Sequence, residues 1–296
     1  MILPHQYPDR TLRHPGPVQP GQMVSHAGDV VAGTLTLPAG SVLMHAIGAE
    51  LTARGIRAAA LDLSGIVLGP MNFVMPTWSK SFDHVAYYSN THHRDEPVHI
   101  ESGTATYGEK DGAPFLHAHL LWHDADGHQR GGHILPFESV LAEECSITFT
   151  GCQQVEMSAR PDAETNFTLF APRNLIQPTT GDLIVAQLRP NADLIDTIEK
   201  LCRCYGVTQG RILSLIGSTV GARFDNGVAV DDIPTEILGL EGSISPCADG
   251  SPQVDSRIAL IDASGTIHFG VPSRGQNPIL ICAEIFIQRY AKGSAQ

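Results

Sequence analysis

An internal repeat is the feature that most constrains the fold of this chain. Residues 111–133 match residues 249–271 without a gap at an offset of 138, with seven identical positions among 23. Upstream of each match, over residues 41–54 and 192–205, apolar side chains recur at helical spacing. The shared order of elements indicates that the chain contains two copies of one unit.

Each copy begins as strand, helix and strand, and continues as several short strands and turns. This pattern predicts an α+β fold in which each unit is a mostly antiparallel sheet with one main helix packed on it. In the second copy, Asp193 is the expected N-cap and Gly206 the expected end of the helix. The expected parts are an extended N-terminal arm over residues 1–27, a first domain over 28–157, a linker over 158–180 and a second domain over 181–296.

Charge and composition limit the partners that we expect. Nineteen Lys and Arg oppose 31 Asp and Glu, which leaves a net charge of −12. Because binding to duplex DNA by bulk charge requires several cations on one face, we expect no direct DNA binding. No apolar run approaches the ~20 residues that span a bilayer, and the N-terminus lacks the apolar core of a secretory signal. We therefore expect a cytoplasmic protein with no membrane partner.

Histidine is concentrated in the first half of the chain, where 13 of 14 histidines lie at or before His133. The segment FLHAHLLWHDADGHQRGGHIL predicts two strands joined by a tight turn. His117 and His119 are two residues apart, so they share one face of their strand. A three-residue loop places His133 opposite His119, whereas a five-residue loop places it opposite His117. Either register brings three imidazoles within cross-strand reach.

Three imidazoles on two strands predict a site for a divalent metal ion, with zinc favoured and iron, nickel or cobalt possible. No fourth protein ligand is evident, and an open coordination position is typical of catalytic zinc. The alternative is a histidine-rich solvent face that binds no ion. At the three corresponding positions the second copy carries Asp255, Arg257 and Val271, so we expect it to be degenerate and to bind no metal.

Two further side chains are candidates for catalytic roles. Glu101 is a candidate general base or partner of a ligating histidine. The alternative is a structural carboxylate, since Glu241 occupies the same place in the second copy. Arg130 is a candidate clamp for a substrate carboxylate, or an ordinary solvated strand residue. No G-x-G-x-x-G or phosphate-loop pattern is present, so we expect no nucleotide cofactor.

The motif D-G-x-P-F-L-H-x-H, followed by a D-x-x-G turn and G-G-H, resembles the PPC domain, the plants and prokaryotes conserved domain also called DUF296 or PD1-like. The resemblance covers residues 30–155, where it is specific, and 181–290, where it is degenerate. It implies the PPC fold, a homotrimer, and a metal on His117, His119 and His133. Prokaryotic members are often labelled DNA-binding by analogy, but this chain has no R-G-R-P core of an AT-hook.

Two functions follow as hypotheses. The first is a metal-dependent enzyme, with zinc as the expected ion, that acts on a small polar metabolite by hydrolytic or lyase-type chemistry. The alternative is a PD1-like DNA-associated or regulatory protein in which the metal is structural or sensory. We expect the first.

Overall fold

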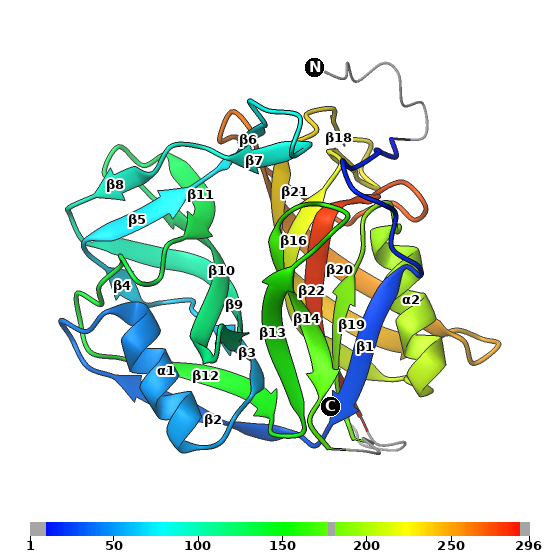
Figure 1. Ribbon diagram of the computed structural model, residues 1–296, viewed down its shortest axis with the longest axis horizontal. Coiled ribbons are helices and arrows are strands. Elements are labelled where there is room, and N and C mark those ends of the chain that lie inside the picture. The colour runs from blue at the N-terminus through cyan, green and yellow to red at the C-terminus, as the bar shows by residue number, and fades with distance from the viewer. Residues whose placement is uncertain (1–9, 177–180, 291–296) are drawn as a thin grey trace.

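The structure is a computed structural model that describes residues 10–176 and 181–290. In this part of the chain two large, mostly antiparallel sheets lie side by side, and one helix packs on the outer flank of each (Figure 1). The helices α1 (Leu43–Ala53) and α2 (Leu194–Tyr205) lie within the two segments expected to be helical. Neither of these two helices is long and apolar enough to cross a lipid bilayer.

Two large sheets contain most of the strands. The first sheet has the order β2 (Val31–Leu37), β12 (Cys145–Cys152), β3 (Ala58–Asp62), β9 (Val98–Lys110), β10 (Ala113–His123), β11 (Gln129–Ile134), β5 (Met71–Val74) and β8 (His92–Arg94), joined by β4 (Val67–Leu68), β13 (Val155–Pro161) and β14 (Thr168–Asn174). The second sheet has the order β1 (Met23–Gly28), β15 (Leu183–Leu188), β22 (Ile279–Arg289), β16 (Gly210–Thr219), β19 (Thr235–Pro246), β20 (Pro252–Asp262) and β21 (Ile267–Gly270). Two small ribbons pair β6 (Pro76–Trp78) with β7 (Ala86–Tyr88), and β17 (Ala222–Arg223) with β18 (Ala229–Val230).

The two sheets share a strand order. The order β2-β12-β3-β9-β10-β11 in the first sheet corresponds, strand for strand, to the order β15-β22-β16-β19-β20-β21 in the second. α1 contacts β10 and β2, and α2 contacts the corresponding strands β20 and β15. The helix of each unit therefore covers the same strands.

The segments expected to be an arm and a linker contain strands. β1, at the end of the expected arm, pairs with β15 at the edge of the second sheet. β14 and the end of β13 lie in the expected linker and form an antiparallel pair. Residues 1–9 of the arm and 177–180 of the linker lie outside the described residues.

The ends of α2 follow the sequence signals. The Asp193 side chain accepts a hydrogen bond of 3.0 Å from the backbone N–H of Asp196, and Gly206 closes the helix at φ 64°. Both features were expected, because an aspartate satisfies free N–H groups at a helix start and glycine adopts the left-handed conformation without strain.

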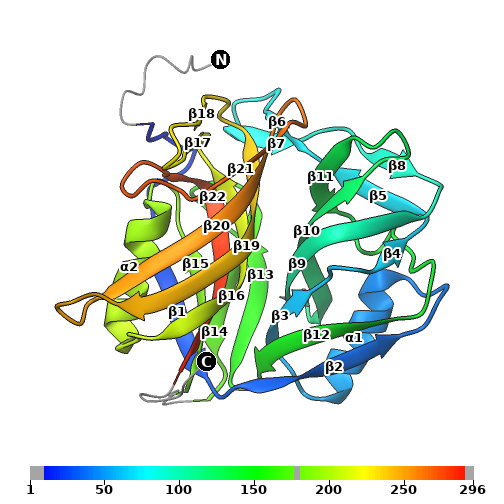
Figure 2. The same cartoon turned by 180° about the vertical axis from the view of Figure 1, so that it is seen from behind.

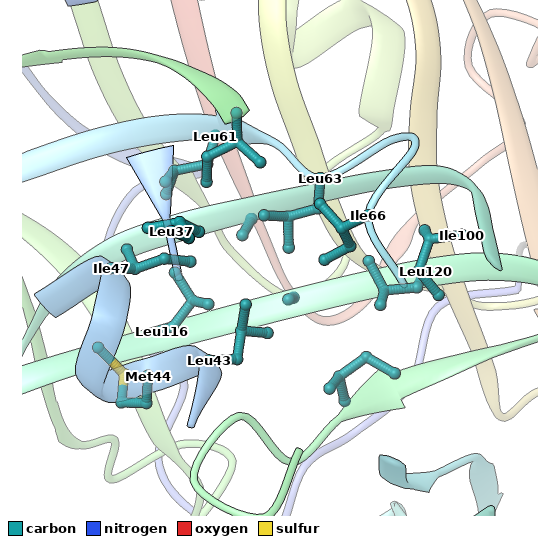
Figure 3. Close-up of a cluster of buried hydrophobic side chains, with 14 of the residues drawn as sticks. Leu37, Leu43, Met44, Ile47, Leu61, Leu63, Ile66, Ile100, Leu116 and Leu120 are labelled. Atoms are coloured by element: carbon teal, nitrogen blue, oxygen red, sulfur yellow. The ribbon is translucent and has the colours of Figure 1, made fainter. Parts of the chain in front are cut away.

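Each sheet buries its own apolar core, and two further clusters join the sheets. In the first unit, Leu43 and Ile47 of α1 lie beside Leu116 of β10, and Leu120, further along β10, lies beside Ile66 and Ile100 (Figure 3). Between the sheets, Leu121 of β10 packs in a cluster with four residues of the second sheet: Ile216, Leu238, Ala259 and Ile261. Seen from behind, β10 and β11 face β19 and β21 across this junction (Figure 2). Direct packing of the two sheets therefore fixes the position of β10 and β11 relative to the second sheet.

Candidate metal centre

The β10–β11 hairpin brings the predicted histidines together. His119 pairs with His133 in the antiparallel ladder, which confirms the register of the three-residue loop. The loop closes through a hydrogen bond of 2.9 Å from the Asp124 N–H to the His128 carbonyl, and Gly127 adopts φ 78°. A residue with a β-carbon is disfavoured at that φ, so the turn depends on this glycine.

The imidazole nitrogens have the spacing that a metal ion requires. One ring nitrogen from each of His117, His119 and His133 lies within 4.8 Å of the other two. The Nε2 atoms of His117 and His119 are 3.1 Å apart. Two nitrogens of a tetrahedral zinc site are separated by about 3.4 Å when each Zn–N bond is about 2.1 Å. The three histidines could therefore hold a divalent ion.

Groups of the second sheet orient two of these imidazoles. His117 Nδ1–H donates to Glu284 Oε1 at 2.9 Å, and His119 Nδ1–H donates to the Ile237 carbonyl oxygen at 2.8 Å. A neutral imidazole has one N–H, so both Nε2 atoms then carry lone pairs. Two lone pairs facing each other at 3.1 Å repel, and a cation between them relieves that repulsion. The donor set thus fits a metal ion.

Burial keeps the cluster in its metal-binding form. Desolvation, followed by repulsion from His117, lowers the pKa of His119 to about 3. The same causes hold the pKa of His133 well below its usual value. Desolvation raises the pKa of Glu236 to about 8, although its carboxyl lies close to the backbone N–H of His133. Neutral imidazole is the form that binds metals, so no proton has to leave these two rings at neutral pH.

A cavity of about 430 Å³ opens beside the histidines. It is lined by residues of both sheets and of the β6–β7 ribbon. From the first part of the chain come Pro76, His84, Ala86, Tyr87, Tyr88, Lys110, Phe115, His117, His119, His133, Ala159 and residues 166–170, and from the second part Gly217, Ser218, Thr235, Glu236, Leu280, Ile281, Cys282 and Glu284. The Tyr88 ring lies 5.2 Å from the ring of His133.

The structure does not bring Glu101 and Arg130 to the histidines. Glu101 accepts a hydrogen bond of 2.8 Å from Gln129 Nε2, and Arg130 Nε donates to Asp124 at 2.7 Å. Neither lines the cavity. Arg130 is three residues from His133 on the same strand, so strand alternation turns it to the opposite face.

Sequence reasoning missed the contribution of the second sheet. Glu284 and Glu236 line the cavity, and Ile237 provides a carbonyl to His119. One signal was available for Glu284: it is a charged residue inside the apolar run from Ile279 to Ile287, where a carboxylate is buried only if it has a partner. In contrast, Asp255 and Arg257, which match His117 and His119 in the sequence repeat, are exposed and do not line the cavity.

A match to a known family lies in the second half of the chain. It is the Plants and Prokaryotes Conserved (PCC) domain, over residues 176–291. The PCC match thus falls on the copy that we expected to be degenerate, and residues 30–155 are not part of it. No curated protein matches the chain.

Several solved structures resemble parts of the chain. A metal-containing protein from Archaeoglobus fulgidus is 24% identical over 47% of this chain and 92% of its own, with a TM-score of 0.36. A plant- and prokaryote-conserved (PPC) protein from Pyrococcus horikoshii is 19% identical over 54% of this chain and 100% of its own, with a TM-score of 0.39. A protein from Ralstonia eutropha JMP134, described as a "putative DNA-binding protein", is 18% identical over 47% of this chain and 89% of its own, with a TM-score of 0.35.

These comparisons correct two expectations. The PCC match favours the alternative function over the metal-dependent enzyme with a small-molecule substrate, which is therefore set aside. The expectation of no direct DNA binding is corrected as well, since the proteins from Ralstonia eutropha and Bacteroides thetaiotaomicron are both described as "putative" DNA-binding proteins. The net charge of −12 is a property of the whole chain, whereas contact with DNA depends on the cations of one local surface.

Proposed function

We propose that this protein is a PD1-like DNA-associated or regulatory protein in which a divalent metal at His117, His119 and His133 is structural or sensory. The observation that carries the proposal is the position of the cluster between the two sheets. His119 is only 1% exposed, and its Nδ1–H is bonded to a carbonyl of β19. An ion there would stabilise the packing of the β10–β11 hairpin against the second sheet.

A structural or sensory ion suits this location for a thermodynamic reason. An ion that binds the folded state alone stabilises it in proportion to RT ln(1 + [ion]/Kd). Because the ligands are oriented by groups of the second sheet, metal occupancy is linked to the packing of one sheet on the other. Zinc remains the favoured ion, since neutral imidazoles suit it, and the ion would supply positive charge at the junction.

The chain organisation belongs to the same proposal. Residues 28–157 and 181–296 are two copies of one unit, and the second copy has lost its metal ligands. The shared strand order and the helix on corresponding strands support this interpretation. The gapless match of residues 111–133 to 249–271 supports it independently.

The test is DNA binding by protein that carries no histidine tag, with and without its metal. Metal content is measured first, and fluorescence anisotropy then follows labelled duplex DNA at several salt concentrations. We expect the metal-loaded protein to bind DNA with an affinity that falls as salt rises, and chelation to change that affinity. Equal anisotropy with and without protein would exclude DNA association, and equal affinity of the two forms would exclude a sensory metal.

A further inference from the structure

The floor of the cavity contains two buried carboxyl groups that belong to the second sheet. Glu284 on β22 is 2% exposed and Glu236 on β19 is 6% exposed. Each has one oxygen, Oε2, that is buried and has no hydrogen-bond partner among the described residues. Both side chains line the same cavity as the three histidines.

We propose that Glu284 and Glu236 are positioning residues of the metal centre, so that the centre is built from both copies of the repeat. Glu284 orients His117 through the hydrogen bond at its Nδ1. Glu236 lies close to the backbone N–H of His133. With the Ile237 carbonyl on His119, two of the three ligands form hydrogen bonds with the second sheet.

Charge balance supports this assignment. Three neutral imidazoles leave a divalent ion with two uncompensated positive charges, and burial of an uncompensated charge is unfavourable. The Glu284 carboxylate, which contacts His117, supplies negative charge beside the ion. Glu284 and Glu236 both line the cavity, and the buried Oε2 atom of each has no partner among the described residues, so each can accept a hydrogen bond from water that completes the coordination of an ion.

Neither of these buried carboxyl groups is paired with a lysine or an arginine among the described residues. In that part of the chain, Glu236 forms no ion pair and Glu284 forms one, with His117. Two other buried glutamates, Glu156 and Glu199, are each paired with two arginines. A metal ion in the histidine cluster provides the missing cation.

This inference rests on the metal site of the proposed function, and the experiment separates the two. Cobalt(II) is titrated into metal-free protein while its visible absorption is recorded, and affinity is measured by competition with a chromophoric chelator. Five proteins are compared: the wild type and the variants Glu284→Gln, Glu236→Gln, Glu241→Gln and His119→Ala. Glu241 is the matched control, because it is an exposed carboxylate on the same strand as Glu236.

We expect Glu284→Gln to weaken cobalt binding by about 10–100-fold and to alter the visible spectrum, as loss of a group that orients a ligand does. Glu236→Gln weakens binding by about tenfold, because it removes a carboxyl group that can accept a hydrogen bond from water at the ion. Glu241→Gln binds as the wild type does, and His119→Ala loses the tight site. Thermal melting in excess chelator checks that each variant is folded. If Glu284→Gln does not fold, Glu284→Asp, which keeps the charge but withdraws the carboxylate, takes its place.

Two outcomes overturn the inference in different ways. If His119→Ala loses cobalt while both glutamate variants keep wild-type affinity and spectrum, the histidine site stands and the role of the second copy is rejected. If the wild type itself takes up no cobalt, the metal site and this assignment fail together.

Discussion

His117 Nδ1 and Glu284 Oε1 lie 2.9 Å apart across the junction of the two sheets, although 167 residues separate them in the chain. The contact joins a candidate metal ligand of the first sheet to a carboxylate of the second. A histidine that donates to a carboxylate in this way has a fixed ring orientation and a more basic Nε2. The candidate metal centre therefore depends on the packing of the two sheets.

The first prediction concerns the most buried candidate ligand. His119→Ala removes one of three imidazoles and leaves the Ile237 carbonyl without its partner, so we expect loss of bound metal and destabilisation of the metal-free fold by about 1–3 kcal/mol. Metal analysis and urea unfolding in chelator measure the two effects. The matched control is His123→Ala, at an exposed histidine of the same strand. Equal metal content in the two variants would contradict the prediction.

The second prediction tests the link between sheet packing and metal binding. Ile261 packs in the cluster that joins the sheets, whereas Ile198 lies in the core of the second sheet. Truncation of either to alanine should destabilise the protein by about 2–5 kcal/mol. Only Ile261→Ala should also weaken metal binding, because it loosens the junction that orients the ligands. Isothermal titration of a divalent metal ion into each variant measures its affinity, and an equal loss of metal affinity in the two variants would contradict the link.

The third prediction is a pH dependence of stability. His14 is 4% exposed, its Nε2 lies 2.8 Å from the Leu280 carbonyl oxygen, and burial lowers its pKa below the usual 6.5. The unfolded state therefore binds a proton more readily, so the free energy of unfolding decreases as the pH falls below about 6.5 toward the pKa of the folded state. His14→Gln removes this titration. Urea unfolding at pH 7, 6 and 5 should show a smaller decrease for the variant, and identical decreases would count against it.

The fourth prediction concerns the start of α2. The Asp193 carboxylate accepts from the backbone N–H of Asp196 at 3.0 Å and from that of Asn277 at 2.8 Å. Asp193→Ala should therefore destabilise the protein by about 0.5–2 kcal/mol. Asp193→Asn keeps one oxygen acceptor but turns an amide NH2 toward the other N–H group, so it should recover only part of the loss. Thermal unfolding of the two variants measures the difference, and a loss for Asp193→Asn that equals that of Asp193→Ala would contradict the capping role of the remaining oxygen.

Much of each unit could be predicted from the sequence, because the relevant signals are local. The ends of α2 follow from Asp193 and Gly206, which satisfy backbone groups within one turn. The pairing of His119 with His133 follows from the two-residue period of a strand and from the length of the loop at Gly127. The convergence of three imidazoles is a consequence of those rules.

Only the tertiary structure decided what faces the imidazoles. The partners of His117 and His119 are Glu284 and the Ile237 carbonyl, 167 and 118 residues away. No turn or strand period relates residues at such separations, because their contact depends on how one sheet packs against the other. The sequence by itself determined the hairpin and its three histidines. Burial of apolar residues between the sheets determined that two carboxyl groups of the second sheet line the same cavity as these histidines.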